Sequence, residues 1–238
     1  MPMHIDVVLH PTEIAQLPAR DLSGTTCVVF DVLRATSSMV TGLANGVSEI
    51  HPVCTIEEAH ALKARLPDVV LGGERQGDPI PGFDIGNSPS EYLGLKGRRV
   101  VTTTTNGTVA LRACERAARV LVGALLNLGA LSAALRALAP KKVLLVCAGT
   151  FDTFALEDAY AAGRLIAELP GASRTDAAQT VAVLAAQYPN SLDALRLARN
   201  GQALTATDRG ADVEWCAQIS RFNVVGLMEA AVIRPLPA

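Results

Sequence analysis

The sequence predicts an α/β fold, in which a layered parallel or mixed sheet is flanked by helices and followed by a mainly helical C-terminal subregion at roughly residues 151–222. Two observations predict it. Short Val-rich runs without alternation are typical of strands that are covered on both faces. Longer segments with helical spacing of apolar residues lie between these runs, and such alternation indicates an α/β architecture. We find no repeat or linker, and expect residues 1–238 to form a single domain.

The expected elements follow one another in a regular order. The strands are Ile5–Leu9, Cys27–Phe30, Val69–Leu71, Val100–Thr103, Val120–Val122 and Val143–Cys147. The helices between them are Ser37–Asn45, Ile56–Arg65, Gly107–Arg116 and Asn127–Leu138. After Thr150 the expected helices are Leu156–Leu169, Ala177–Tyr188, Ser191–Arg199 and Asp208–Ser220. The last segment, Val224–Ile233, is apolar enough to return to the core.

Composition excludes several classes of function. The chain carries 21 basic and 23 acidic side chains and a net charge of -2, so we expect neither nucleic acid nor a membrane as partner. The four histidines have no zinc-ligand spacing. We find no signal pattern and no apolar run of about 18 residues, and therefore expect a soluble, cytoplasmic protein. The apolar C-terminal segment leads us to expect a homodimer.

The segment Gly72–Tyr92 is unusually rich in glycine, proline and acids. From Gly72 to Pro89 it contains five glycines, three prolines and three acids, Glu74, Asp78 and Asp84. A long loop in a compact domain is usually functional or disordered, and its apolar residues argue against disorder. We therefore expect an ordered loop whose acids contribute to a site.

Four of the expected strands end in polar clusters. These clusters are Asp31–Ser38, Gly72–Arg75, Thr102–Thr108 and Ala148–Thr150, the last followed by Asp152, Glu157 and Asp158. In open α/β sheets ligands bind outside the carboxyl ends of the strands. If the four strands are parallel neighbours, all four clusters lie on one rim.

The first cluster has two interpretations. Asp31 is suited to capping the helix that follows it. The functional interpretation is that Asp31, Arg34 and Thr36 act together, because a carboxylate, a guanidinium and hydroxyls at a helix start suit a metal and a phosphate.

The other clusters also have structural alternatives. Thr102–Thr108 is either a strand with an Asn-Gly hairpin turn or an oxyanion cradle ahead of a helix. Arg75 is either an ion-pair partner of Glu74 or an anion clamp. Helix-dipole effects explain Glu157, whereas Asp158 lies on the face expected to be buried and needs a partner such as a metal.

The acids in these clusters predict a magnesium site. Asp31, Glu74 and one or both of Asp84 and Asp158 would provide an oxygen-only site, which suits a hard cation such as Mg²⁺. Arginines and hydroxyls on the same rim suit an anionic substrate, most simply a phosphate monoester. Arg34 and Arg75 would neutralise charge, and the Thr-rich turn would hold phosphoryl oxygens.

Several of these segments resemble one known family. DVLRATSS, GGERQG, PGFDIGNSPSEY and TTTTNGT, with the later CAGT and its downstream ED pair, are similar in order and spacing to the 2-phosphosulfolactate phosphatases. The resemblance implies an α/β fold and a Mg²⁺-dependent hydrolase that converts 2-phosphosulfolactate to sulfolactate and phosphate, a step of coenzyme M biosynthesis. It extends to about Ala162 and is weaker in the C-terminal helices.

The resemblance, with residue chemistry, assigns expected roles. Asp31 and Arg34 are the expected catalytic residues, and Asp31, Glu74, Asp84 and Asp158 the expected metal ligands. The expected substrate-binding residues are Thr36, Arg75, Asn87, Ser88, Thr104, Asn106 and Gly107. The physiological substrate and the nucleophile, either water or Asp31, stay open. The alternative function is a non-catalytic protein that binds or senses a phosphorylated or sulfonated small acid.

Overall fold

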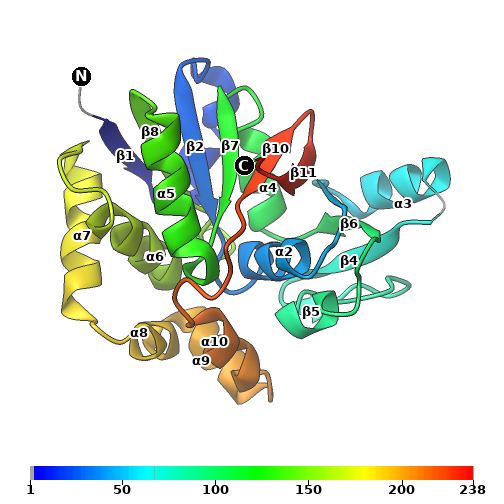
Figure 1. Cartoon of the computed structure of the whole chain (residues 1–238). Helices are drawn as coiled ribbons and strands as arrows, with labels where there is room; N and C mark the ends of the chain where they lie inside the picture. Colours follow the sequence, from blue (N-terminus) through cyan, green and yellow to red (C-terminus); the bar gives the residue numbers. More distant parts are fainter. Residues whose placement is uncertain (1–2, 67, 238) are drawn as a thin grey trace.

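The computed structural model describes residues 3–66 and 68–237. Within them, 11 strands form one mixed sheet in the order β5-β4-β6-β3-β11-β10-β7-β2-β8-β1-β9, flanked by the helices α1 to α10 (Figure 1). The predicted α/β class with a mixed sheet and a helical C-terminal subregion is confirmed.

The elements have the following bounds. The strands are β1 His4–Val8, β2 Thr25–Phe30, β3 Glu49–Pro52, β4 Val70–Arg75, β5 Asp78–Pro79, β6 Arg99–Thr103, β7 Arg119–Gly123, β8 Lys142–Cys147, β9 Ser173–Arg174, β10 Gly226–Glu229 and β11 Val232–Pro235. The helices are α1 Pro11–Ile14, α2 Ala35–Ala44, α3 Ile56–Arg65, α4 Gly107–Ala113, α5 Leu128–Leu138, α6 Leu156–Ala167, α7 Asp176–Gln187, α8 Ser191–Leu197, α9 Arg199–Ala206 and α10 Gly210–Cys216.

All six predicted strands are present, but several short elements were not predicted. The strand β3 contains a histidine and a proline, so its sequence lacks the apolar run that marks the six predicted strands. The segment Gly72–Tyr92 is not one continuous loop: Gly72–Arg75 completes β4, Asp78–Pro79 forms β5, and Pro89–Tyr92 is a 3₁₀ turn. Residues 200–207 were expected to link two helices, but most of them belong to helix α9.

The sheet consists of two halves that run in opposite directions. Strand β2 is parallel to β7 and β8, and β6 is parallel to β3 and β4. Between the halves lie three antiparallel pairings, β7 with β10, β10 with β11, and β11 with β3. The condition that all four cluster-bearing strands are parallel neighbours is therefore not met, although β2 is parallel to β8 and β4 is parallel to β6.

The C-terminal hairpin joins the halves. Ala230 and Ala231 have φ angles of 48° and 59°, the sign that two-residue hairpin turns of type I′ require. The hairpin buries Met228 and Ile233, so the apolar end of the chain returns to the core as predicted. The homodimer was expected because this segment is apolar, but these side chains are buried within the chain itself. The homodimer stays a prediction.

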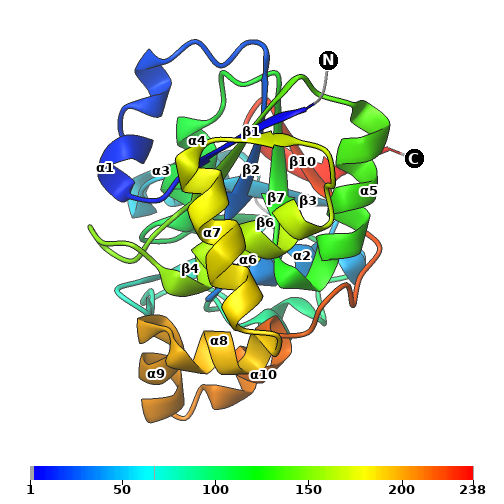
Figure 2. The same cartoon turned by 90° about the vertical axis from the view of Figure 1, so that its left-hand side faces the viewer.

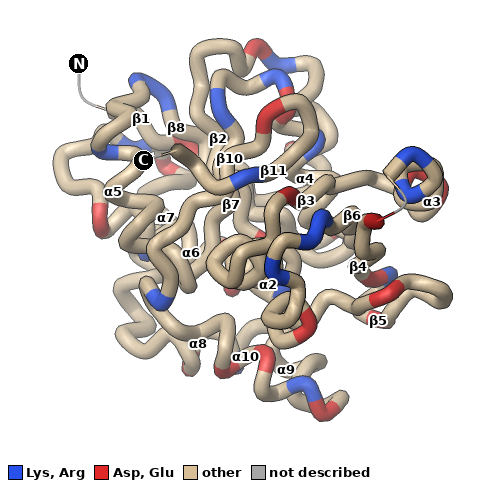
Figure 3. The backbone as a smooth tube through the Cα atoms, turned by 45° about the vertical axis from the view of Figure 1, so that its right-hand side comes forward, with Lys and Arg blue, Asp and Glu red and all other residues tan. Residues whose placement is uncertain are grey.

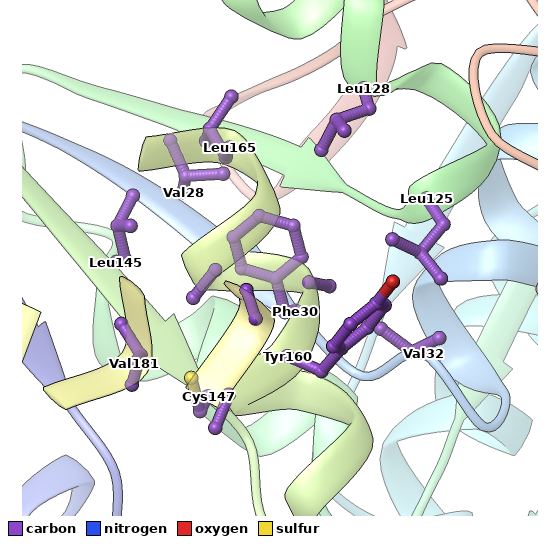
Figure 4. Packing of buried hydrophobic residues seen from close by; sticks show 14 of the residues in the cluster. Val28, Phe30, Val32, Leu125, Leu128, Leu145, Cys147, Tyr160, Leu165 and Val181 are labelled. Atoms are coloured by element: carbon purple, nitrogen blue, oxygen red, sulfur yellow. The ribbon is translucent and has the colours of Figure 1, made fainter. Parts of the chain in front are cut away.

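Two apolar cores lie on the two faces of the sheet, because successive side chains of a strand point to opposite faces. Val28 and Phe30 of β2 pack with Leu165 of α6 and its neighbours in one core (Figure 4). Val29 packs with Met39 of α2 in the other core. In Figure 2, α6 and α7 lie in front of β1 and β2, and α8, α9 and α10 gather at one end of the molecule.

Acidic and basic residues are interspersed along the chain (Figure 3). The expectation that nucleic acid is not a partner stays a prediction. None of the helices in residues 3–66 and 68–237 is long and apolar enough to cross a membrane.

Candidate active site

A cavity of about 80 Å³ brings all four predicted polar clusters together. It lies where the chain leaves β2, β6 and β8, and where β4 turns into β5. The halves of the sheet are also turned relative to each other. In Figure 1, β2 and β7 run up and down, whereas β4 and β6 lie to their right and run sideways. The cavity is lined by Asp31, Leu33, Arg34, Glu74, Gln76, Gly77, Asn87, Thr105, Asn106, Gly149, Thr150, Phe151, Asn200 and Leu204.

Five of the predicted site residues line this cavity, and seven do not. Those that do are Asp31, Arg34, Glu74, Asn87 and Asn106. Those outside the lining are Thr36, Arg75, Asp84, Ser88, Thr104, Gly107 and Asp158.

Asp31 contacts the start of helix α2, as the structural interpretation predicts, and it also lines the cavity. Its Oδ1 accepts a hydrogen bond of 3.0 Å from the amide N–H of Ala35, the first residue of α2. Among the described residues, none donates a hydrogen bond to Oδ2. The Thr36 hydroxyl donates to the Asp31 carbonyl at 2.9 Å and accepts from the Asp31 amide at 3.0 Å. One carboxylate oxygen thus supports the helix start, Thr36 holds the backbone, and the second oxygen accepts no hydrogen bond from the described residues.

The surroundings of Asp31 favour its protonated form. Burial raises the pKa of Asp31 to about 7, against the lowering effect of the Ala35 N–H. The negative charges of Glu74 and Glu157 add to the rise. A pKa near neutrality is the range in which a carboxylate serves best as a general base, and strongly perturbed carboxylates in clefts are typical of active sites.

Glu74 joins two of the cavity walls. Its Oε1 accepts from the Thr105 amide at 2.6 Å, and its Oε2 accepts from the Gly77 amide at 2.7 Å and the Thr105 hydroxyl at 3.0 Å. The carboxylate therefore holds the β4–β5 turn against the turn after β6. Thr105 was not among the predicted residues, although it lies inside the Thr-rich run.

The structure places Arg75 outside the cavity lining. Its guanidinium donates to the carbonyl oxygens of Glu74 and Cys54 at 2.8 and 3.2 Å, and to the Thr103 hydroxyl at 2.8 Å. It does not pair with the Glu74 carboxylate, and it does not reach the cavity. Arg75 follows Glu74 directly in an extended strand, and the alternation of side chains turns it to the other face.

The structure does not bring Asp84 to the other acids. Its Oδ2 accepts from the Leu71 amide at 2.8 Å and from Lys63 Nζ at 3.0 Å, and its side chain is 46% exposed. The amide of Asp84 also donates to the Leu71 carbonyl. The segment after β5 folds back along the outside of β4, which carries Asp84 away from the cavity.

Asp158 has partners other than a metal. Its Oδ1 accepts from the Val32 amide at 2.8 Å, and its Oδ2 accepts from the Gly149 amide at 3.1 Å. Burial raises the pKa of Asp158, and the charges of Glu157 and Asp31 add to the rise. Glu157 is buried too and accepts from Asn200 at 2.6 Å. The helix-dipole interpretation of Glu157 did not predict that its side chain is buried.

The Thr-rich turn is built around two interlocking side chains. Thr104 and Thr108 exchange hydrogen bonds with each other's amides at 3.1 and 3.0 Å, and Gly107 begins helix α4. The hairpin alternative is therefore wrong. Asn106 donates to the Ala148 and Phe151 carbonyls and accepts from the Phe151 amide. It joins this turn to the loop after β8.

Gly107 lies close to the Asp31 carboxylate. A Cβ at this position would lie 2.5 Å from Asp31 Oδ2 and 2.7 Å from the Ala35 Cβ. We predict that Gly107→Ala displaces the Asp31 side chain and lowers kcat/KM by roughly 10–100-fold, because small displacements of reacting groups are costly. Gly94→Ala is the matched control, since nothing lies within 4 Å of its Cβ position. Equal kcat/KM for the two variants would contradict the prediction.

Three residues at the site come from the C-terminal helices and were not predicted, namely Asn200 and Leu204 of α9 and Asp212 of α10. Asn200 lines the cavity, and Asp212 of α10 accepts from Arg34 Nη1 at 2.6 Å. The sequence contains one signal for Asp212, namely a carboxylate next to the apolar residues Val213 and Cys216 that α10 buries. A buried acid needs a partner, but the sequence does not identify Arg34 as that partner.

The oxygen atoms that line the cavity fit a magnesium ion that takes its remaining ligands from water and substrate. Among the described residues, no group of three or more His, Cys, Asp or Glu side chains is placed to hold a metal ion. Two carboxylates, Asp31 and Glu74, line the cavity, and Asn87 Oδ1 is buried there without a partner among the described residues. Mg²⁺ usually binds to one or two carboxylates and completes its shell with water and substrate phosphate.

Comparison with known proteins identifies the family. Residues 12–231 match the family model of 2-phosphosulpholactate phosphatase. The chain is similar to a protein of Carboxydothermus hydrogenoformans named probable 2-phosphosulfolactate phosphatase, at 38% identity over 226 residues, 94% of this chain and 92% of the relative. A Deinococcus radiodurans protein of the same name is 41% identical over 205 residues, 83% of this chain and 85% of the relative. The chain therefore belongs to the 2-phosphosulfolactate phosphatase family, a family of phosphoric monoester hydrolases.

Proposed function

We propose that this phosphatase hydrolyses the phosphate monoester of 2-phosphosulfolactate, or of a similar small 2-hydroxy acid, and that it requires Mg²⁺. The supporting observation is that Asp31, with one unengaged carboxylate oxygen, shares a cavity with Arg34 and Glu74. The names of the relatives support the sulfolactate substrate.

Electrostatics supports a cation in this cavity. Two carboxylates and one guanidinium line it, and the further acids Glu157 and Asp158 are buried nearby. A substrate with phosphate, carboxylate and sulfonate groups would add several negative charges to a site that has no excess of positive charge. Asp31 and Glu74 would hold Mg²⁺, and the bound ion would supply Lewis-acid polarisation of the phosphoryl oxygens.

Three residues that line the cavity would have separate roles in the hydrolysis. Arg34 would donate hydrogen bonds to the phosphoryl oxygens and offset the charge that develops there. Asp31 would either take a proton from the attacking water or attack phosphorus itself. Asn87 Oδ1, a buried acceptor, would hold a donor such as a water or the hydroxyl of the product.

The test is phosphate release by the purified protein. We expect turnover of 2-phosphosulfolactate with Mg²⁺ and its loss with EDTA, followed by recovery when Mg²⁺ is restored. 2-Phospholactate, which lacks the sulfonate, tests how much the second anionic group contributes. Tight binding of the phosphorylated acid without metal-dependent turnover would contradict the proposed hydrolysis and favour the alternative of a non-catalytic binding or sensor protein. Cytoplasmic localisation also stays a prediction.

A further inference from the structure

One carboxylate from the C-terminal helices joins two segments that carry cavity residues. Asp212 Oδ2 accepts from Arg34 Nη1 at 2.6 Å, and Asp212 Oδ1 accepts from the Ser88 hydroxyl at 2.6 Å. The side chains of Arg34 and Asp212 are 6% and 11% exposed, so water screens this ion pair little. Ser88 directly follows Asn87, which lines the cavity.

The contact leaves most of the Arg34 guanidinium unengaged. A guanidinium has five N–H donors in a rigid planar fork. Asp212 is its single side-chain or backbone acceptor among the described residues, through Nη1. Because the fork is planar and rigid, holding Nη1 restricts the directions in which the remaining donors can point, and Arg34 lines the cavity. An anion bound there would meet an arginine whose orientation is already set.

Helix α10 is itself anchored to the same cavity wall. Arg209, at the start of α10, donates through Nη1 to the Gly77 carbonyl at 2.5 Å, and Gly77 lines the cavity. Trp215 of α10 donates through Nε1 to the Thr41 hydroxyl of α2 at 3.1 Å. These contacts place Asp212 on a helix that is fixed at both of its ends, which suits a role in orientation.

We propose that Asp212 is a positioning residue of the phosphatase reaction, which sets the Arg34 guanidinium for the phosphoryl group and holds Ser88 beside Asn87. The proposal rests on the proposed function, since it assumes that Arg34 binds the phosphoryl group. The competing explanation is that Asp212 neutralises a buried arginine and contributes to stability alone.

A double-mutant cycle separates these explanations. Asp212→Asn keeps the shape and an acceptor oxygen but removes the charge, and we expect kcat/KM to fall by about 10–100-fold. Arg34→Lys removes the planar fork that Asp212 orients. We expect Asp212→Asn to have little further effect in the Arg34→Lys background, because the two residues act as one unit. Independent, multiplicative losses in the double variant would overturn the proposal.

The control and a milder variant protect the test against misfolding. Glu214→Gln removes another acid of α10, whose partner Arg196 is 54% exposed, and should leave kcat/KM unchanged. Ser88→Ala removes one support of Asp212 and should lower kcat/KM about 2–5-fold with a folded protein, as expected for one lost hydrogen bond. If Asp212→Asn and Ser88→Ala change thermal stability but leave kcat/KM at the control value, Asp212 is structural.

A binding readout distinguishes failure of this proposal from failure of the proposed function. The Tm of each variant is measured with Mg²⁺ and with increasing inorganic phosphate. We expect phosphate to raise the Tm of the wild-type protein and of Glu214→Gln, and to raise that of Asp212→Asn less. A wild-type protein that neither binds phosphate nor turns over substrate refutes the proposed function. An equal response of wild type and Asp212→Asn refutes the positioning role.

Discussion

Asp31→Asn is expected to lower kcat at least ~10³-fold, because Asp31 is the proposed nucleophile or general base. The substitution is nearly isosteric. The asparagine Oδ1 can still accept from the Ala35 amide, as Asp31 Oδ1 does at 3.0 Å. The fold around α2 should therefore persist, and phosphate release measured at saturating substrate and Mg²⁺ tests the chemical role. Normal kcat in this variant would remove Asp31 from the mechanism and leave the family assignment intact.

The same variant should make the metal-free protein more stable at neutral pH. Burial raises the pKa of Asp31 from its ordinary value of 3.8 to about 7, so the folded protein holds a proton that the unfolded chain releases. Stability is thus lost as pH rises from about 4 to about 7, by up to about 4 kcal/mol. Asp31→Asn has no charge to bury and should lack this loss. Urea unfolding at pH 5 and pH 8 in EDTA measures the difference.

Asp84→Asn is the matched control, since its pH dependence has the opposite sign. The Leu71 amide and Lys63 lower the pKa of Asp84 by stabilising its charged form. Its contribution to stability is present at neutral pH and is lost as pH falls. We expect this variant to retain activity, because Asp84 lies outside the cavity lining. If Asp31→Asn and Asp84→Asn show the same change in pH dependence, the assigned cause is wrong.

Glu74→Gln is expected to weaken Mg²⁺ binding by at least about tenfold, because it removes one of two carboxylates that line the cavity. Chelation of the metal should abolish activity in the wild-type protein, and the variant should need more Mg²⁺ to regain it. The variant should also unfold more easily, by about 1–3 kcal/mol, since an amide NH₂ would face the N–H groups of Gly77 or Thr105.

Glu91→Gln separates these two effects. Glu91 accepts from the amides of Gly86 and Ser88 at 2.8 and 2.9 Å but does not line the cavity. We expect both variants to lose stability and Glu74→Gln alone to lose Mg²⁺ affinity, measured by titration calorimetry. Equal Mg²⁺ affinity in the two variants would leave Glu74 as a residue that holds the β4–β5 turn.

Sequence patterns alone predicted the parts of this site that depend on local order. Asp31 and Arg34 follow a buried strand directly, and Asn106 follows another, so the carboxyl ends of strands carried them to the cavity as expected. The positions of Arg75 and Asp84, which lie outside the cavity lining, could not be predicted from local patterns. Strand alternation turned Arg75 away from the cavity, and hydrogen bonds between Asp84 and the backbone of Leu71 in β4 hold Asp84 outside it.

The sequence by itself determined the α/β class, six of the strands and the polar clusters that follow four of them, because hydrophobic periodicity and turn residues act over a few neighbours. The tertiary structure decided how the clusters meet. The C-terminal hairpin pairs antiparallel with β7 and with β3, so the strands on its two sides run in opposite directions. Asp212 contacts Arg34, which is 178 residues away along the chain. Such contacts depend on the packing of distant segments, which no local pattern records. A buried arginine and a buried aspartate each needed a partner, and folding paired them with one another.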